Sequence, residues 1–165
     1  MGPLELRTLK GLVLSGCTDI MGYEALDFYD VDSLLTDEER MIRDAVRDWV
    51  DESVIPKIEN ACRDGVFLDE WRQEIGSMGI LGAPLKGYGC PGLSYTAYGV
   101  ICRELERGDS GIRSFASVQG SLAMYPIWDF GSEDQKEKYL PRMATGELIG
   151  CLLYTSPSPR DSIAS

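Results

Sequence analysis

The sequence predicts an all-α protein with about six helices and the start of a β-strand at its C-terminal end. Three observations carry this prediction. Apolar residues recur at spacings of three and four along most of the chain, as on one face of a helix. Residues 36–39 and 132–135 are capping boxes, in which Thr or Ser is followed three positions later by Glu or Gln. Residues 115–128 contain no charged side chain, which predicts a central helix surrounded by other helices.

The first three predicted helices lie before a glycine-rich loop. The first follows the capping box at residues 36–39. Its predicted inner face consists of Met41, Ile42, Ala45, Val46, Trp49 and Val50. A second, short helix begins near Pro56 and ends at Gly65, and a third spans about residues 68–77. Residues 82–92 match no phosphate-binding pattern, so we expect a tight structural loop with left-handed glycines.

The last three predicted helices include the central one. Ser94 caps the fourth helix. Its expected inner face holds Tyr98, Ile101, Cys102 and Leu105. Its expected solvent face holds Arg103, Glu104, Glu106 and Arg107. The central helix follows, and Pro126 predicts an irregularity near its end. The last helix runs from residues 132–135 to Gly146. The central helix also carries small polar residues that favour a pocket lining as well as a core position: Ser114, Ser117, Gln119, Gly120 and Ser121.

Composition places the chain among globular proteins with free thiols. Its 165 residues, 44% hydrophobic and 26% charged, fit one domain with a sizeable core. The net charge of −11 argues against a nucleic-acid partner, and no apolar run reaches the ~20 residues of a membrane span. The five cysteines match no metal template and no disulfide framework, so a reducing compartment is expected. The absence of histidine excludes Ser-His-Asp and Cys-His nucleophiles and His-ligated metal sites.

The two ends of the chain are poorly patterned. Residues 1–22 are expected to be a leader that is disordered or not native, and Met21 is an alternative start. Because this leader is a poor mitochondrial presequence, we expect the bacterial cytoplasm, with the mitochondrial matrix as the alternative. Residues 23–147 form the predicted helical domain, and residues 148–153 begin a strand. Residues 154–165 are expected to be a disordered, artefactual tail.

Six segments occur in an order and at spacings that resemble one family of enzymes. They are D-F-Y-D-V-D-S-L-L-T-D-E-E-R-M-I-R-D (27–44), I-G-S-M-G-I-L-G (75–82), G-Y-G-C-P-G (87–92), Y-G-V-I-C-R-E-L-E-R-G-D-S-G-I-R-S (98–114), S-V-Q-G-S-L-A-M-Y-P-I (117–127) and F-G-S-E-D-Q-K-E-K-Y-L-P-R-M-A-T-G-E-L-I-G-C (130–151). With them, residues 26–151 resemble the N-terminal helical domain of the acyl-CoA dehydrogenase family, and glutaryl-CoA dehydrogenase in particular. The resemblance implies a flavoenzyme with a helical N-terminal domain, a β-domain and a C-terminal four-helix bundle.

The resemblance also implies the chemistry of the complete enzyme. A Glu base removes the α-proton of an acyl-CoA, and the β-hydride passes to FAD. The glutaryl subgroup then decarboxylates its product, in fatty acid or amino acid catabolism. The implied partners are an acyl-CoA substrate, electron-transfer flavoprotein and further copies in a homo-tetramer, with no nucleic acid, membrane or metal.

The resemblance assigns substrate binding to Arg113 and Ser114, at the entrance to the uncharged helix. Arg113 is a fixed cation that can bind an anionic oxygen. The alternative is that Arg113 forms an ion pair with Asp109, four residues earlier. Where the glutaryl subgroup usually carries an Arg for the distal carboxylate, this chain has Asp69, with Arg72 one turn later. This departure weakens the glutaryl assignment and leaves the family assignment intact.

The resemblance ends at Cys151. The flavin-contacting strand motif of the family does not follow, and the sequence after this residue contains neither the β-domain nor the Glu base. We therefore expect a truncated dehydrogenase that supplies one wall of the acyl-CoA pocket, contains no catalytic or flavin-binding residue, and is inactive alone. The alternatives are a stand-alone helical module that binds acyl-CoA or another protein, and a complex in which a second chain supplies the missing domains.

Overall fold

The computed structural model describes residues 28–150. The expected leader (residues 1–22), the alternative start Met21 and the expected tail (residues 154–165) lie outside the described residues. The described part of the predicted strand at residues 148–153 has no strand hydrogen bonding, and its remainder lies outside the described residues, so this strand remains a prediction.

The chain divides into two compact units, Met1–Leu34 and Leu35–Ser165. The described part of the first unit contains one short 3-10 helix, η1 (Val31–Leu34). The backbone N–H and the hydroxyl of Ser33 both donate to the carbonyl oxygen of Asp30, at 3.0 and 2.7 Å, and close its first turn.

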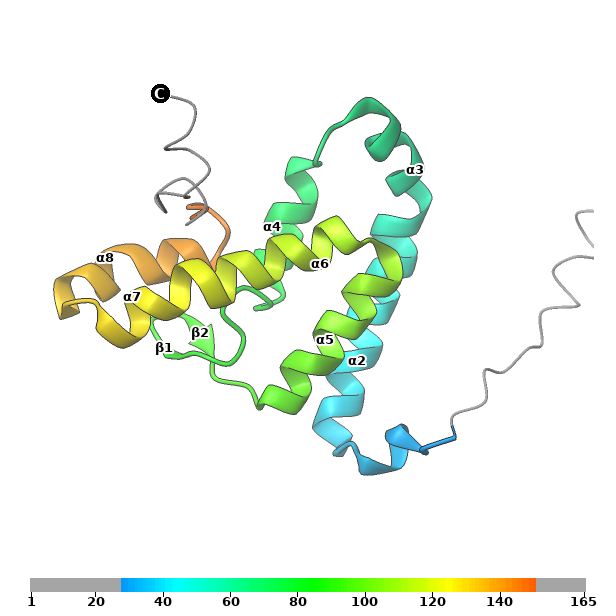
Figure 1. The fold of residues 1–165 in the computed structure, drawn as a ribbon, viewed down its shortest axis with the longest axis horizontal. Helices are drawn as coiled ribbons and strands as arrows, with labels where there is room; N and C mark the ends of the chain where they lie inside the picture. The colour runs from blue at the N-terminus through cyan, green and yellow to red at the C-terminus, as the bar shows by residue number, and fades with distance from the viewer. Residues whose placement is uncertain (1–27, 151–165) are drawn as a thin grey trace, which may run out of the picture. The chain divides into compact units, whose positions relative to one another are not determined.

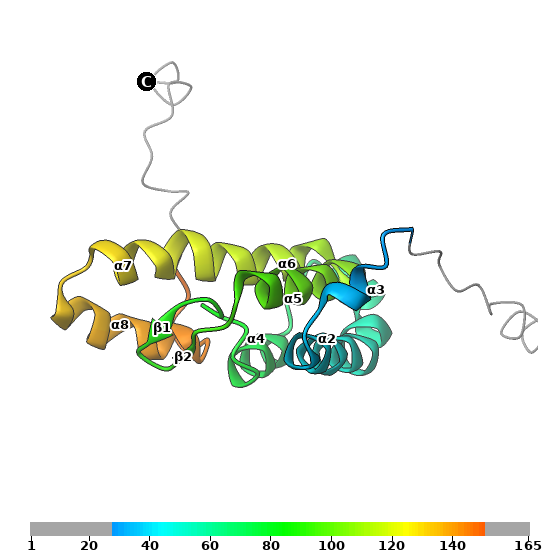
Figure 2. The same cartoon turned by 90° about the horizontal axis from the view of Figure 1, so that it is seen from below.

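The described part of the second unit is helical apart from one small hairpin, which confirms the predicted all-α class. Its helices are α2 (Asp37–Trp49), η2 (Val50–Val54), α3 (Ile55–Asp64), α4 (Asp69–Ser77), α5 (Tyr95–Gly108), α6 (Ser110–Ser117), η3 (Val118–Met124), α7 (Tyr125–Phe130) and α8 (Glu133–Ala144). In Figure 1, α5 lies along α2, and α6, η3 and α7 follow one another as a long helix that returns as α8. Figure 2 shows this long helix on one side of the unit and α2, α4 and α8 on the other.

Both predicted capping boxes are present. At the start of α2, the N–H of Glu39 donates to Thr36 Oγ1 at 3.2 Å, and the N–H of Thr36 donates to Glu39 Oε2 at 3.0 Å. Ser132 and Gln135 exchange the same two bonds at the start of α8, at 3.3 and 2.9 Å. Each box satisfies N–H groups that have no partner inside the helix, so both helices begin where the sequence predicts.

Two prolines follow π-helical turns. η2 directly precedes α3, which has Pro56 in its first turn, and η3 directly precedes α7, which has Pro126 in its first turn. Proline lacks an N–H, and its ring collides with the carbonyl four residues earlier in an α-helix, whereas the wider π turn moves that carbonyl away. The irregularity predicted at Pro126 is confirmed. The two helices predicted around Pro56 are joined through η2 without an intervening loop.

The core of the second unit is apolar and draws on most of its helices. Its fully buried large side chains include Trp71, Ile75, Leu81, Ile101, Leu105, Ile112, Met124 and Leu140. The predicted burial of Met41 and Ala45 is wrong, because Met41 is 66% exposed and Ala45 is also exposed. The core stripe of α2 is narrower than predicted, and its buried member is Val46, with Ile42 and Trp49 packed at its edge.

The charged end of α5 differs from the prediction at Glu104. The sequence predicts that Glu104 faces the solvent, but its side chain is only 2% exposed. Arg47 donates to its two oxygens at 2.9 and 3.0 Å, and Arg103 and Arg107 add ion pairs at 3.1 and 3.2 Å. Burial raises the pKa of Glu104, but the hydrogen bonds from Arg47 and Arg103 outweigh it, so the net pKa is lowered.

The central helix is covered on one side only, so the prediction that other helices surround it is wrong for the described residues. Its buried members from α6 and η3 are Ile112, Ala116, Gln119, Gly120, Ala123 and Met124. Leu122 and Phe130 are 48% and 81% exposed. One buried member allows close backbone packing, because a Cβ on Gly120 would lie 3.2 Å from the backbone nitrogen of Gly82. Within residues 28–150, no helix is long and apolar enough to cross a membrane.

Residues 82–92 contain a hairpin that the sequence analysis did not predict. Its strands, β1 (Lys86–Gly87) and β2 (Cys90–Pro91), are antiparallel. Tyr88 and Gly89, with φ of 54° and 84°, form the two-residue turn between them. Two left-handed residues match the twist of a hairpin, as in a type I′ turn. The predicted left-handed glycines are confirmed at Gly82, Gly87, Gly89 and Gly92.

Candidate functional site

The site expected at Arg113 and Ser114 lies on α6. Asp109 is the N-cap of this helix, and its Oδ1 accepts a hydrogen bond from the N–H of Ile112 at 2.9 Å. The first N–H groups of a helix lack internal partners, and a capping carboxylate satisfies one of them. The carboxylate of Asp109 is therefore used by the helix backbone, and the alternative prediction of an Arg113–Asp109 ion pair is wrong.

Arg113 instead pairs with Glu106 on α5. Its Nε donates to Glu106 Oε2 at 2.6 Å, and its Nη1 donates to Ser117 Oγ at 3.4 Å. Ser110 Oγ donates to the other oxygen of Glu106 at 2.5 Å. The hydrogen bonds from Arg113 and Ser110 lower the pKa of Glu106, so this carboxylate is ionised at neutral pH. The side chain of Arg113 is 35% exposed, which leaves its guanidinium accessible to an anion from solvent.

Two consecutive helices contribute a row of polar side chains to this site. The polar row consists of Tyr98, Cys102 and Glu106 on α5 and of Arg113, Ser117 and Ser121 on α6 and η3. Members on each helix are four residues apart and share a face. The hydroxyl of Tyr98 lies 3.4 Å from Ser121 Oγ, and burial raises the pKa of Tyr98 and of Cys102, so both stay neutral at neutral pH. Sequence reasoning missed this row, although the matched spacing of four on neighbouring helices was a readable signal.

An apolar cavity of about 290 Å³ opens beside Ser114. Its lining consists of Gly111, Ser114, Phe115, Val118, Gln119, Ile149 and Gly150. Phe115 also packs against Phe67, with ring centroids 5.0 Å apart. We call this space the Ser114 cavity. Its volume is at the lower end of small-molecule pockets, which suits a short acyl chain. Ser114 carries the hydroxyl of this lining, whereas Arg113 is not part of it, because its guanidinium pairs with Glu106 on α5.

Asp69 and Arg72 take structural positions. The Nη1 of Arg72 donates to the carbonyl oxygen of Gly146 at 2.6 Å, and its Nη2 lies 3.4 Å from Asp69 Oδ1. Asp69 is 87% exposed. Neither residue is part of the lining of the Ser114 cavity. The structure therefore gives no support to Arg72 as a replacement for the carboxylate-binding Arg of the glutaryl subgroup.

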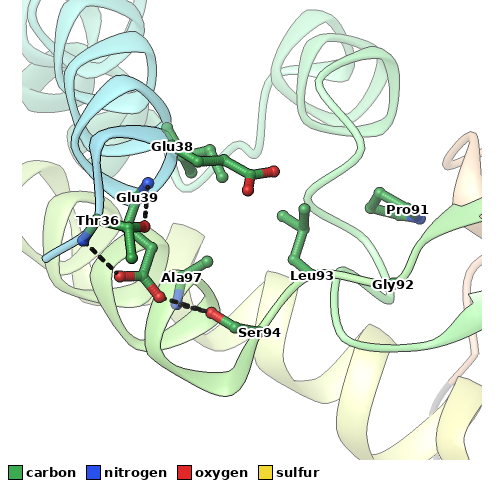
Figure 3. A pocket seen from close by; sticks show the side chains of 9 residues that line it. Thr36, Glu38, Glu39, Pro91, Gly92, Leu93, Ser94 and Ala97 are labelled. Atoms are coloured by element: carbon green, nitrogen blue, oxygen red, sulfur yellow. Dashed lines mark hydrogen bonds between the residues drawn. The ribbon is translucent and has the colours of Figure 1, made fainter.

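A second cavity, of about 320 Å³, lies where the N-termini of α2 and α5 meet (Figure 3). The carboxylate of Glu39 bridges them, because it accepts from the N–H of Thr36 and, at 2.8 Å, from Ser94 Oγ. Both hydrogen bonds lower the pKa of Glu39, and the bond from Thr36 has the larger effect. The carboxylate of Glu38 points into the same space (Figure 3). Two carboxylates make this cavity unfavourable for an anionic ligand. The Ser114 cavity is the better candidate for an acyl-CoA.

The fold agrees with comparisons to known proteins. A sequence profile described as Acyl-CoA dehydrogenase, N-terminal domain, matches residues 36–147. The chain belongs to the acyl-CoA dehydrogenase family.

Several relatives of known structure or sequence cover the same region. A crystal structure of a glutaryl-CoA dehydrogenase from Mycobacterium smegmatis in complex with FADH2 is 47% identical, with a TM-score of 0.73, over 76% of this chain and 32% of that chain. Another crystal structure of glutaryl-CoA dehydrogenase from Mycobacterium smegmatis is 53% identical, with a TM-score of 0.70, over 73% and 31% of the two chains. Mitochondrial isovaleryl-CoA dehydrogenase of Pongo abelii is 31% identical over 135 residues, which are 79% of this chain and 32% of that protein. The chain spans about a third of the length of these relatives.

The Ser114 cavity does not fit a flavin dinucleotide. At about 290 Å³, it has the volume for a small ligand and not for a dinucleotide. The residues that line this cavity therefore do not hold FAD by themselves.

Proposed function

We propose that this chain is the substrate-facing helical part of an FAD-dependent acyl-CoA dehydrogenase of the glutaryl-CoA type. It supplies one wall of the acyl-CoA pocket, and Arg113 and Ser114 contact the substrate. The flavin and the Glu base belong to parts of the complete enzyme beyond the described residues. Electron-transfer flavoprotein is the proposed electron acceptor, a homo-tetramer the proposed assembly, and the bacterial cytoplasm the proposed location.

The observation that carries this proposal is the apolar Ser114 cavity on α6, the helix that also carries the partly exposed guanidinium of Arg113. A short acyl chain fits an apolar slot of about 290 Å³, and burial of its methylene groups favours binding there. The CoA thioester of a dicarboxylic acid keeps one free carboxylate, distal to the thioester, that needs a cation in a partly buried site. The guanidinium of Arg113 suits it because it is planar, always charged and accessible. We therefore propose a short dicarboxylic acyl-CoA as the substrate, oxidised and then decarboxylated by the complete enzyme.

An exposed apolar face supports the proposal that further domains complete the site. Leu122, Phe67 and Ile149 are 48%, 44% and 44% exposed, and Ile149 also lines the Ser114 cavity. Exposed apolar residues beside a ligand site are typical of surfaces that contact another domain or protein. We therefore expect the isolated chain to bind ligand weakly and to catalyse no oxidation.

The second candidate is a stand-alone module that binds acyl-CoA or another protein without redox chemistry. One observation favours it: in the described residues, every buried side-chain nitrogen and oxygen has a hydrogen-bond partner. A helical unit with satisfied buried polar groups has what it needs to fold cooperatively. Measurable acyl-CoA affinity and a single sharp unfolding transition, with no exposed apolar surface detectable by dye binding, would favour this candidate.

Calorimetric titration tests the substrate-binding role of Arg113. The 165-residue chain and its Arg113→Met variant are titrated with glutaryl-CoA and with butyryl-CoA. Loss of a charge-assisted hydrogen bond should raise the dissociation constant of glutaryl-CoA at least about tenfold, or about 1.4 kcal/mol. The dissociation constant of butyryl-CoA should change less than about threefold. Arg63→Met is the matched control, because Arg63 forms an exposed pair with Glu59 at 2.6 Å on α3.

Two results would contradict the proposal. If Arg113→Met weakened the binding of both acyl-CoAs equally, Arg113 would have no role in recognising the carboxylate. Oxidation of an acyl-CoA by the purified chain with added FAD and an artificial electron acceptor would contradict its inactivity alone.

A further inference from the structure

We propose that Gln119 is the positioning residue of the Ser114 cavity: it holds the wall formed by Ile149 and Gly150 and so limits the length of acyl chain that the cavity accepts. The effect on acyl length rests on the proposed function, whereas the effect on the wall does not. Gln119 lies one turn after Phe115 and next to Val118, at the start of η3, and lines the same cavity.

The amide of Gln119 ties this helix to the segment that follows α8. The side chain is 1% exposed. Its Nε2 donates to the carbonyl oxygens of Met143 and Leu148, at 3.1 and 2.8 Å. Its Oε1 accepts from the N–H of Gly150 at 2.9 Å. The amide nitrogen and the amide oxygen of Gln119 are therefore bonded to the backbone of the last turn of α8 and of the segment that follows it.

The described end of this segment depends on Gln119 for its hydrogen bonds. Residues 149 and 150 have no regular secondary structure, so the backbone groups around them cannot find partners in a helix or a sheet. A backbone N–H or C=O group that is buried away from water without a hydrogen-bond partner costs free energy comparable to a lost hydrogen bond. Gln119 supplies, from a side chain, the donor and acceptor that a neighbouring strand would supply.

Packing fixes the same wall from a second direction. A Cβ on Gly150 would lie 2.7 Å from Ala123 Cβ and 3.0 Å from Met143 Cε, so the glycine backbone sits directly against η3. Ala123 and Gln119 are both buried members of η3. The wall is therefore held by close contact with Ala123 and by the hydrogen bonds of Gln119.

A fixed wall has a consequence for the ligand. The Ser114 cavity lies between the α6–η3 helix and Ile149–Gly150, with Gln119 joining the two sides. An acyl chain that runs towards Ile149 and Gly150 and is longer than the cavity displaces one of them, and movement of Gly150 breaks its bond to Gln119. The intact chain should therefore favour short acyl groups, and loss of the amide should relax that preference.

The test uses Gln119→Met in the full 165-residue chain, because Met has a similar volume and forms no such hydrogen bonds. Calorimetry with butyryl-CoA and octanoyl-CoA gives the ratio of the two dissociation constants. We expect this ratio to move about tenfold towards octanoyl-CoA. Amide hydrogen exchange at Gly150, followed by NMR, should become at least about tenfold faster, with the amide of Leu105 in α5 as the internal reference.

A control separates positioning from general loss of stability. Ile75→Val removes a methylene from the core at α4, where Ile75 is 0% exposed, and changes neither Gln119 nor the lining of the Ser114 cavity. It should leave the butyryl-to-octanoyl ratio and the relative exchange of Gly150 unchanged. If Gln119→Met does not fold, Gln119→Asn serves the same test, because its shorter amide cannot reach Leu148 and Gly150 together.

The outcomes distinguish this inference from the proposed function. Binding of both acyl-CoAs with an unchanged ratio in Gln119→Met would overturn the inference and leave the proposed function standing. Failure of the parent chain to bind either acyl-CoA would overturn the proposed function and the role in acyl length. Unchanged exchange at Gly150 would overturn the positioning of the wall in either case.

Discussion

Replacement of Glu104 by alanine tests the buried charge cluster where α5 packs on α2. The carboxylate is 2% exposed and lies within 3.2 Å of Arg47, Arg103 and Arg107. Truncation removes the acceptor that these three arginines share and the charge that compensates them. The arginines themselves are 43%, 47% and 39% exposed, so they keep access to water when the carboxylate is gone.

The expected magnitude follows from this geometry. Removal of one partner from a buried ion pair costs about 3–5 kcal/mol. The lower end applies here, because the arginines can be rehydrated and Arg107 retains its pair with Asp51 at 2.8 Å. We therefore expect Glu104→Ala to lower the free energy of unfolding by about 3 kcal/mol, and the Tm by about 10 °C for a domain of this size.

Urea unfolding followed by circular dichroism measures this loss. Glu59→Ala is the control, because Glu59 and Arg63 form an i,i+4 pair at 2.6 Å with both side chains largely exposed. Such a surface pair contributes about 0.5 kcal/mol or less. A loss below about 1 kcal/mol for Glu104→Ala, or equal losses in the two variants, would refute the reasoning.

The same variant has a predictable pH dependence. Burial raises the pKa of Glu104, but the hydrogen bonds from the arginines lower it by more. The pKa of Glu104 in the folded state therefore lies below its value in the unfolded state. The contribution of Glu104 to stability is then complete above the unfolded pKa of about 4.3 and is lost as the pH falls through the folded pKa. The stability difference between the parent and Glu104→Ala should therefore be constant from pH 7 to about pH 5 and shrink below about pH 4. A difference that stays constant into acid would contradict the lowered pKa.

Two further predictions concern single residues. Gly76→Ala should lower the free energy of unfolding by about 2 kcal/mol or more, because its Cβ would lie 2.2 Å from the carbonyl oxygen of Thr145. Gly99→Ala should raise it by about 0.5–1 kcal/mol in the same urea assay, because a Cβ at Gly99 meets nothing within 4 Å. Burial raises the pKa of the Cys90 thiol to about 11, so iodoacetamide at pH 8 should label the exposed Cys62 well before Cys90 in peptide mass spectrometry. Equal costs at the two glycines, or equal labelling of the two cysteines, would contradict these predictions.

Helix positions were predictable because their signals are local. The capping boxes at Thr36 and Ser132 satisfy N–H groups within three residues, so no distant part of the chain is needed to place them. Burial of a charged residue is not local. Glu104 lies at a position that its polarity marks as exposed, and its burial depends on Arg47, 57 residues earlier in the sequence. Periodicity ranks the faces of a helix but does not identify the ion-pair partners that make a buried charge tolerable.

The candidate site was predictable in outline and not in its contacts. Arg113 and Ser114 came from a family resemblance, and their role in substrate binding remains a prediction. The predicted pairing of Arg113 with Asp109 is wrong because the Asp109 carboxylate caps α6 and accepts from the N–H of Ile112. α5 ends at Gly108 and α6 begins at Ser110, so Asp109 caps the new helix, and the guanidinium reaches Glu106, seven residues earlier, on the other helix.

The two proposals assign two different properties of ligand binding to one continuous stretch of helix. The break between α5 and α6 brings Arg113 beside Glu106. Six residues later, Gln119 bonds to Gly150 in the wall of the Ser114 cavity. In the proposed complex, the charge of Arg113 acts on the polar end of the ligand, and the wall acts on the length of its apolar part. Sites that share no partner contribute additively. Substitution of Arg113 should therefore change the preference between charged and uncharged acyl ends, and substitution of Gln119 the preference between acyl lengths, with the double variant showing the sum of both. A departure of more than about 0.5 kcal/mol from that sum would mean that the two residues act on the ligand through one shared contact.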